Sequence, residues 1–143
     1  METILHPEQY NLIYNVSWLS LGSSLYALNN QHYTLWFVPG SIFITSITYW
    51  YKPDYSWRRY FDMAVAKSMV LYQLYMAYYS EYYYLYYLVT CLGLSFYPIG
   101  IYYFYKKDYW TSTYSHILLH VLCNIGNIIL YSGKPVRSLT NTT

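Results

Sequence analysis

Charged side chains are scarce in this sequence. Lys, Arg, Asp and Glu together make up 10% of its 143 residues, whereas soluble domains contain about 25%. The chain therefore has too few charged groups to cover a surface that faces water. Its formal net charge of +2 is too small to indicate a nucleic-acid partner. The length leaves room for one domain, which we interpret as an integral membrane protein whose partner is the lipid bilayer.

Cysteine is also rare, and no leader sequence is visible. Cys91 and Cys123 each fall in the middle of an apolar stretch, so a disulfide framework is not expected. The first nine residues are acidic and contain no apolar core, so a cleavable signal peptide is not expected either. The first apolar stretch would then direct membrane insertion by itself.

Apolar and aromatic residues are abundant. The sequence is 56% hydrophobic and contains 24 tyrosines, a residue type that is enriched where membrane helices meet the interface. These residues are organised in stretches of about 20, the length of an α-helix that crosses the hydrocarbon core. The pattern predicts an all-α polytopic bundle of five membrane helices in a single domain. The five predicted spans are residues 10–28, 33–51, 60–79, 82–105 and 110–131, followed by a polar tail at residues 132–143.

The basic residues between the stretches predict the orientation. The connections after the second and fourth stretches carry basic residues, and those after the first and third carry none. Because Lys and Arg are retained on the cytoplasmic side, the N-terminus is predicted to be cytoplasmic and the protein to be a multi-pass membrane protein. The basic residues concerned are Lys52, Arg58, Arg59, Lys106 and Lys107.

Two histidines mark the last stretch, which carries no Lys, Arg, Asp or Glu between residues 110 and 131. His116 and His120 are four residues apart, so both imidazoles lie on one face of a helix. Polar groups inside a membrane are costly unless something binds or pairs them, which makes them candidates for a functional site. At 1.5 Å per residue they lie roughly 9 and 15 Å from the start of the stretch.

Two further polar residues are predicted to lie at the same depth, in the cytoplasmic half of the bundle. Ser46 is near the cytoplasmic end of the second stretch, and Asp62 is in the first turn of the third. Two neutral imidazoles and a carboxylate are suitable zinc ligands. A bound zinc ion lowers the pKa of its water towards neutrality and so produces a hydroxide nucleophile.

The order and spacing of these residues resemble a known superfamily. The chain contains Ser46-Ile-Thr-Tyr-Trp50, then Arg59-Tyr-Phe-Asp62-Met, and then His116-Ile-Leu-Leu-His120 followed by Gly126. The pattern is similar to that of the CREST-type membrane hydrolases, which include alkaline ceramidases and the progestin and adipoQ receptors. Members share Ser-x-x-x-His, an Asp at the start of the next helix, and His-x-x-x-His in the last helix. Their core has seven spans, so this chain would be a reduced member.

The resemblance implies a zinc-dependent hydrolase that cleaves an amide or ester bond of a lipid. His116 and His120 would bind the metal, Asp62 would orient or deprotonate the metal-bound water, and Ser46 would hydrogen-bond to the reacting group. The chain departs from the pattern at Trp50, which stands where the family has its first His. Asp62 would then have to become a direct metal ligand, or the site is a metal-free relic.

Other interpretations of the same residues remain open. The His pair can simply hydrogen-bond across the bundle to Tyr, Ser or Asn, and Asp62 can interact with the helix dipole. Lys67 can reach towards the interface or pair with Asp62, which would favour a metal-free site. The alternative function is a non-catalytic membrane scaffold or interaction protein with the same bundle. A bis-His haem is disfavoured, since two residues on one face of one helix cannot be opposite axial ligands.

Overall fold

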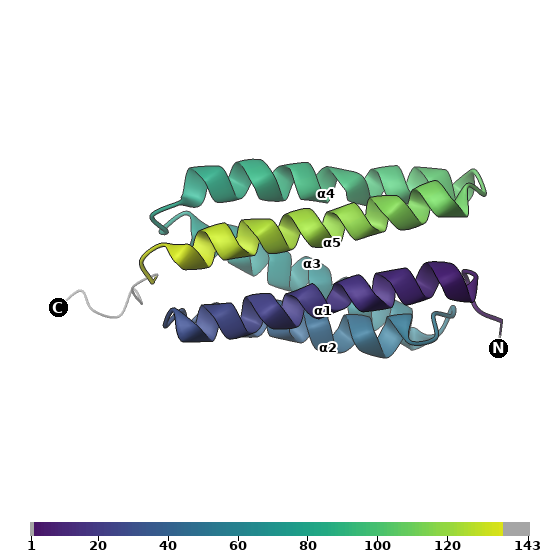
Figure 1. Cartoon of the computed structure of the whole chain (residues 1–143), viewed down its shortest axis with the longest axis horizontal. Coiled ribbons are helices and arrows are strands. Elements are labelled where there is room, and N and C mark those ends of the chain that lie inside the picture. Colours follow the sequence, from purple (N-terminus) through teal and green to yellow (C-terminus); the bar gives the residue numbers. More distant parts are fainter. Residues whose placement is uncertain (1, 136–143) are drawn as a thin grey trace.

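The computed structural model describes residues 2–135, which fold into five α-helices and no β-strand. The all-α prediction is therefore confirmed. Each helix runs antiparallel to the one before it in the chain (Figure 1). Residues 136–143 of the predicted polar tail lie outside the described residues, and Ser132 still belongs to the last helix. The helices are α1 (Pro7–Asn29), α2 (Phe37–Trp50), α3 (Trp57–Ala77), α4 (Tyr83–Tyr105) and α5 (Tyr109–Ser132).

Local sequence signals explain where two of the helices begin. Pro7 is the first residue of α1, where its missing N–H costs no hydrogen bond. The side chain of Gln9 accepts a hydrogen bond from the backbone N–H of His6 at 3.1 Å. Asp108 precedes α5 and accepts from the backbone N–H of Thr111 at 3.2 Å and from its hydroxyl at 2.7 Å. These bonds stabilise the carboxylate and hold the pKa of Asp108 below its usual value.

The helices correspond to the five predicted stretches, with one correction at α2. This helix begins at Phe37 rather than at residue 33, because residues 33–36 form a turn. Its 14 residues measure about 21 Å along the axis, less than the roughly 30 Å of a hydrocarbon core. Among residues 2–135, α4 and α5 are long and apolar enough to cross a membrane.

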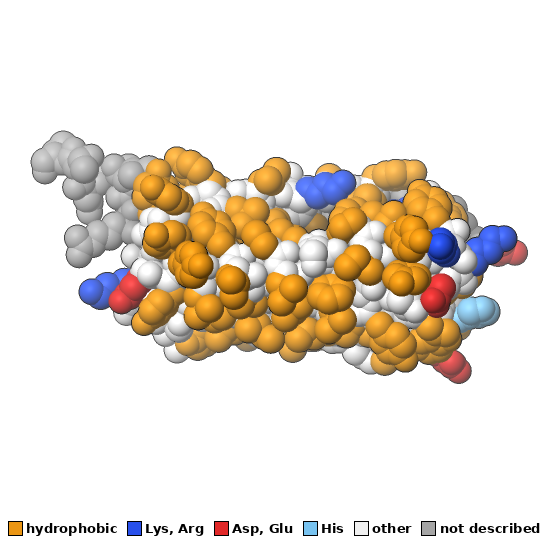
Figure 2. Space-filling view, turned by 90° about the horizontal axis from the view of Figure 1, so that it is seen from above, with side chains coloured by type: hydrophobic (Ala, Val, Ile, Leu, Met, Phe, Trp, Pro, Cys, Tyr) orange, Lys and Arg blue, Asp and Glu red, His pale blue; other side chains and the backbone are white. Residues whose placement is uncertain are grey.

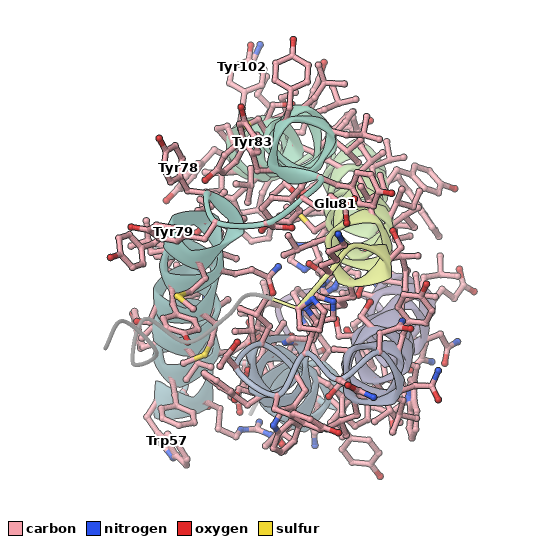
Figure 3. The ribbon with its side chains drawn as sticks, turned by 90° about the vertical axis from the view of Figure 1, so that its left-hand side faces the viewer. Trp57, Tyr78, Tyr79, Glu81, Tyr83 and Tyr102 are labelled. Carbon is pink, nitrogen blue, oxygen red and sulfur yellow. The ribbon has the colours of Figure 1, made fainter. Side chains whose placement is uncertain are left out.

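The helices form a ring around a central space, in the order α3, α2, α1, α5, α4. Each helix packs along its neighbour in this order, whereas α3 and α4, the two ends of the series, touch only sparsely. Viewed down the bundle, α3 stands apart from α5 across the centre (Figure 3). The contact between α3 and α4 is therefore the weak seam of the ring.

Helices α4 and α5 pack closely because small residues lie between them. A Cβ atom on Gly126 of α5 would collide with the hydroxyl of Thr90 on α4. A Cβ atom on Gly93 of α4 would lie 3.1 Å from the sulfur of Cys123 on α5. Small residues of this kind let membrane helices approach closely. Cys91 and Cys123 are both free.

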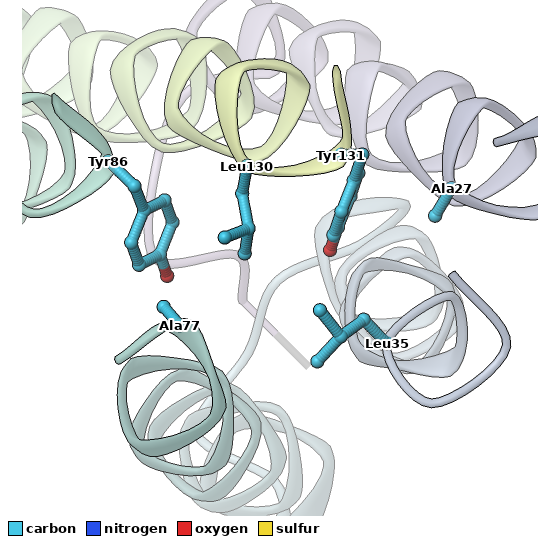
Figure 4. Close-up of a cluster of buried hydrophobic side chains, with 6 residues drawn as sticks. All are labelled: Ala27, Leu35, Ala77, Tyr86, Leu130 and Tyr131. Atoms are coloured by element: carbon cyan, nitrogen blue, oxygen red, sulfur yellow. The ribbon is translucent and has the colours of Figure 1, made fainter. Parts of the chain in front are cut away.

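The best-packed core lies at the end of the bundle that carries the α1–α2 and α3–α4 connections. We call this the tyrosine end, and the opposite end the charged end. Helices α1, α3, α4 and α5 and the α1–α2 connection each contribute a buried side chain to this core (Figure 4). Because this core closes the tyrosine end, the space inside the ring lies towards the middle of the bundle and the charged end. The core residues are Ala27, Leu35, Ala77, Tyr86, Leu130 and Tyr131.

The outer surface is apolar in the middle and polar at both ends. Figure 2 shows acidic and basic side chains at the two ends of the visible face and apolar side chains between them, with one basic patch inside the apolar region. Exposed aromatic side chains gather near the helix ends; Tyr78, Tyr79 and Tyr83 point away from the bundle at the tyrosine end (Figure 3). At the charged end, Tyr51 and Trp57 are exposed.

Candidate functional site

A cavity of about 460 Å³ fills the space inside the ring. Its walls come from all five helices and are mainly apolar. A second cavity of about 260 Å³ lies closer to the charged end, and both are lined by Asp62, Met63, Tyr97 and His116. The polar residues around the larger cavity are Ser20, Ser46, Asp62, Lys67, Gln73, Tyr86, Thr90, Tyr97, His116, His120, Asn124 and Asn127. The four site residues predicted from the sequence are all among them.

The two histidines face each other on the inner side of α5. Their Nε2 atoms are 3.2 Å apart, so one neutral ring donates its N–H to the other ring. His120 is buried, and its backbone carbonyl accepts a hydrogen bond from the side chain of Asn124 at 2.7 Å. The ring of Trp50 lies edge-on to the ring of His116, with centroids 4.9 Å apart. Trp50 thus lies beside the pair, at the position where the family resemblance implies a third imidazole.

Ser46 and Asp62 form the second polar pair and join α2 to α3. The hydroxyl of Ser46 donates to the Oδ1 atom of Asp62 at 3.1 Å. Because α3 begins at Trp57, Asp62 lies in its second turn rather than its first. The helix dipole acts mainly within the first turn, so it does not explain this carboxylate. A polar partner and the cavity account better for its position.

Lys67 does not pair with Asp62. The one ion pair within residues 2–135 joins Arg58 and Asp54, 2.9 Å apart in the α2–α3 connection. Hydrogen bonds from Ser56 and then from Arg58 hold the pKa of Asp54 below its usual value. Residues 62 and 67 lie on different sides of α3, because five positions turn the helix by about 140°. Lys67 instead lies over the ring of Tyr97 on α4, 5.9 Å from its centroid.

The side chains can be tested against the zinc ion that the family resemblance implies. Two imidazole nitrogens that share a tetrahedral zinc ion, each at 2.0–2.1 Å, stand about 3.3 Å apart. The separation of 3.2 Å between His116 and His120 is close to this value. Yet residues 2–135 contain no group of three His, Cys, Asp or Glu side chains near enough to hold a metal ion. A catalytic zinc ion with three protein ligands does not fit the side chains as they stand, and zinc stays a prediction.

A buried network centred on Gln73 of α3 was not predicted from the sequence. The amide nitrogen of Gln73 donates to the hydroxyl of Tyr86 at 3.0 Å and to the Oδ1 atom of Asn127 at 2.6 Å. The hydroxyl of Tyr131 donates to the amide oxygen of Gln73 at 2.5 Å. All four side chains are buried. The network therefore fastens α3 to α4 and α5 at the tyrosine end of the weak seam.

A signal for this network was present in the last stretch of the sequence. Positions 116, 120, 124, 127 and 131 are separated by steps of four, four, three and four residues, the spacing of a single helix face. All five carry a polar atom. Asn124 is bonded to Ser23 of α1, whose hydroxyl donates to its Oδ1 atom at 2.6 Å. The polar face of α5 is thus the common wall of the site, and the His pair is only one part of it.

Comparison with known proteins adds no family to these observations: no family model, no curated protein and no solved structure matches this chain. The function is therefore argued from the site itself.

Proposed function

We propose that this chain is a multi-pass membrane protein whose five helices all cross the bilayer, with the N-terminus in the cytoplasm and with the turn at residues 33–36 completing the span of the shorter α2. Each helix has an exposed aliphatic residue near its middle, namely Leu19, Ile44, Leu71, Leu92 and Ile125. A surface that is apolar on every helix would be unstable in water but suits lipid. Most charged residues of the visible face lie at the two ends of the bundle, and one basic patch interrupts the apolar surface between them (Figure 2).

The low hydropathy of α1 is consistent with this proposal. Four of its serines, Ser17, Ser20, Ser23 and Ser24, are buried and face other helices rather than lipid. Ser17 donates to the carbonyl of Ile13 at 2.8 Å, so its hydroxyl is satisfied within the helix. Serine at helix contacts is common in membrane bundles. A mean hydropathy therefore understates how apolar the outer face of α1 is.

Reporter fusions test the number of spans. Reporters inserted at Pro53 and Lys107 should be cytoplasmic, and reporters at Asn30 and Ser80 should be on the opposite side, as the distribution of Lys and Arg requires. A two-span protein with only α4 and α5 in the membrane would instead place Asn30, Pro53 and Ser80 on one side. That result would refute the five-span proposal.

We further propose that the central cavity receives a lipid-like molecule. The observation that carries this proposal is a cavity with mainly apolar walls that is also lined by the Ser46–Asp62 pair and the His116–His120 pair. Its volume of about 460 Å³ lies within the roughly 300–1,000 Å³ of ligand pockets. An amphiphile would place its chain along the apolar walls and its polar group among the polar side chains that line the space.

Hydrolysis of an ester or amide bond in such a molecule is the second candidate function. It is favoured by the chemistry of the polar region, which supplies a carboxylate, a hydroxyl and two imidazoles. Asp62 or His116 could act as the general base that takes a proton from an attacking water, and the hydroxyl of Ser46 could donate to the reacting carbonyl group. The resemblance to ceramidase-like hydrolases points to the same chemistry.

The two candidates are separated by measuring binding and turnover together. The purified protein is incubated with a long-chain ester, a long-chain amide and an ether analogue that cannot be cleaved. Binding of the ether with turnover of an ester or amide, lost in Asp62→Asn, supports hydrolysis. Binding without turnover supports a non-catalytic lipid-binding or scaffold role. Failure to bind the ether at all contradicts the proposed use of the cavity.

A further inference from the structure

Lys67 is an isolated cation in the middle of the apolar surface. It lies at the centre of the 21-residue helix α3, about 15 Å from either end at 1.5 Å per residue. Its side chain is exposed, and it makes no ion pair within residues 2–135. A lone charge at this depth in a bilayer is strongly unfavourable and indicates a functional partner. The ring of Tyr97 at 5.9 Å compensates only part of this cost.

The position of Lys67 connects the outer surface with the cavity. Lys67 on α3 and Tyr97 on α4 both line the 460 Å³ cavity, and they face each other across the sparsely packed seam between these helices. The bonds that hold α3 to α4 are made by Gln73 with Tyr86, and by the hydroxyl of Tyr87 with the carbonyl of Leu74. Both lie towards the tyrosine end. The seam at Lys67 therefore has no such fastening.

The cavity walls behind this seam suit a hydrocarbon chain. Ile42, Val70, Leu94 and Leu119, from four different helices, line the cavity. Asp62 lines it as well, but its carboxylate is bonded to Ser46 and makes no ion pair with Lys67. The cavity thus combines apolar walls with a cation that makes no ion pair within residues 2–135.

We propose that the cavity binds a single-chain amphiphile with an anionic head, which enters through the α3–α4 seam and pairs with Lys67. This inference rests on the proposed function and names the class of ligand. A carboxylate is the natural head group, because it forms a charge-assisted hydrogen bond with an ammonium group.

The test compares ligands that share one chain and differ in the charge of the head. Radiolabelled oleate is bound to the full-length protein in phosphatidylcholine nanodiscs and displaced with oleate, oleyl alcohol or oleylamine. A charge-assisted bond predicts that oleate binds about tenfold or more tighter than oleyl alcohol, and that oleylamine binds weakest. This preference should disappear in Lys67→Met and Lys67→Gln and persist in Lys67→Arg.

A second lysine provides the matched control. Lys106 also lies over a tyrosine ring, that of Tyr102 at 4.7 Å, but at the end of α4 and outside the cavity lining. Lys106→Met should keep the preference for oleate. An unchanged preference in folded Lys67→Met, or tighter binding of oleylamine than of oleate, overturns the proposal. If oleate does not bind but labelled oleyl alcohol does, the anionic ligand is refuted and the lipid-binding function stands. If neither ligand binds, both the anionic ligand and the proposed lipid-binding function are refuted.

Discussion

Gln73 should be the residue whose loss most weakens the attachment of α3. It makes three hydrogen bonds to buried groups, with Tyr86, Asn127 and Tyr131. Gln73→Leu keeps a similar volume but leaves these three groups without their partner. Hydrogen bonds between membrane helices contribute about 0.6 kcal/mol each on average, so the expected loss is about 2 kcal/mol in the free energy of unfolding. This corresponds to a roughly thirtyfold change in the unfolding equilibrium.

Unfolding in mixed micelles, with increasing denaturing detergent and tryptophan fluorescence as the signal, measures this loss. Thr90→Val is the matched control. Thr90 is also buried beside the cavity, but its hydroxyl has no hydrogen-bond partner within residues 2–135. Its replacement should change the stability by less than about 0.5 kcal/mol. Equal stability of Gln73→Leu and Thr90→Val would show that the network does not hold α3 in place.

Three other predictions follow from single contacts. Gly126→Ala should destabilise the protein by about 1–3 kcal/mol, because the added Cβ collides with α4. Gly22→Ala, where no atom lies within 4 Å of the added Cβ, should stabilise it by about 0.5–1 kcal/mol. The reverse order of stability in the same unfolding assay would contradict the close α4–α5 packing. Trp50→His should raise the zinc content towards one equivalent by elemental analysis, and adding His120→Ala should remove it; no zinc in folded Trp50→His would refute the geometry of the pair. Asp108 has a lowered pKa in the folded state, so its contribution to stability is complete above the pKa of the unfolded state, near 4, and declines as the pH falls through the folded-state pKa. Asp108→Asn should therefore weaken the loss of stability in acid. An identical pH profile of stability in the variant would argue against the helix cap.

The sequence predicted that Ser46, Asp62, His116 and His120 lie at one depth, and the structure brings all four to one cavity. The sequence also departs from the family pattern at Trp50, and the indole lies beside His116. The resemblance did not indicate how the pairs form, which is Ser46 with Asp62 and one histidine with the other. Pairing depends on side-chain directions that short motifs do not specify.

The sequence by itself determined the elements of this protein. Stretches of about 20 apolar residues and the polar connections between them predicted five helices, and each of them exists. The spacing of His116 and His120 was sufficient to place them on one face, because a helix repeats every 3.6 residues. The scarcity of charge was sufficient to predict an apolar outer surface. These are local properties, in which neighbouring residues and the helical repeat decide the outcome.

Only the tertiary structure decided how the helices are arranged and rotated about their axes. The ring order leaves α3 and α4, which are adjacent in sequence, as the least-packed pair. The rotation of α3 turns Asp62 towards Ser46, Lys67 towards Tyr97 and Gln73 towards α5. Each of these contacts is made with a different helix, so no local pattern specifies them. The cavity and its cationic rim exist because packing, rather than helical periodicity, fixes which face of α3 turns inwards.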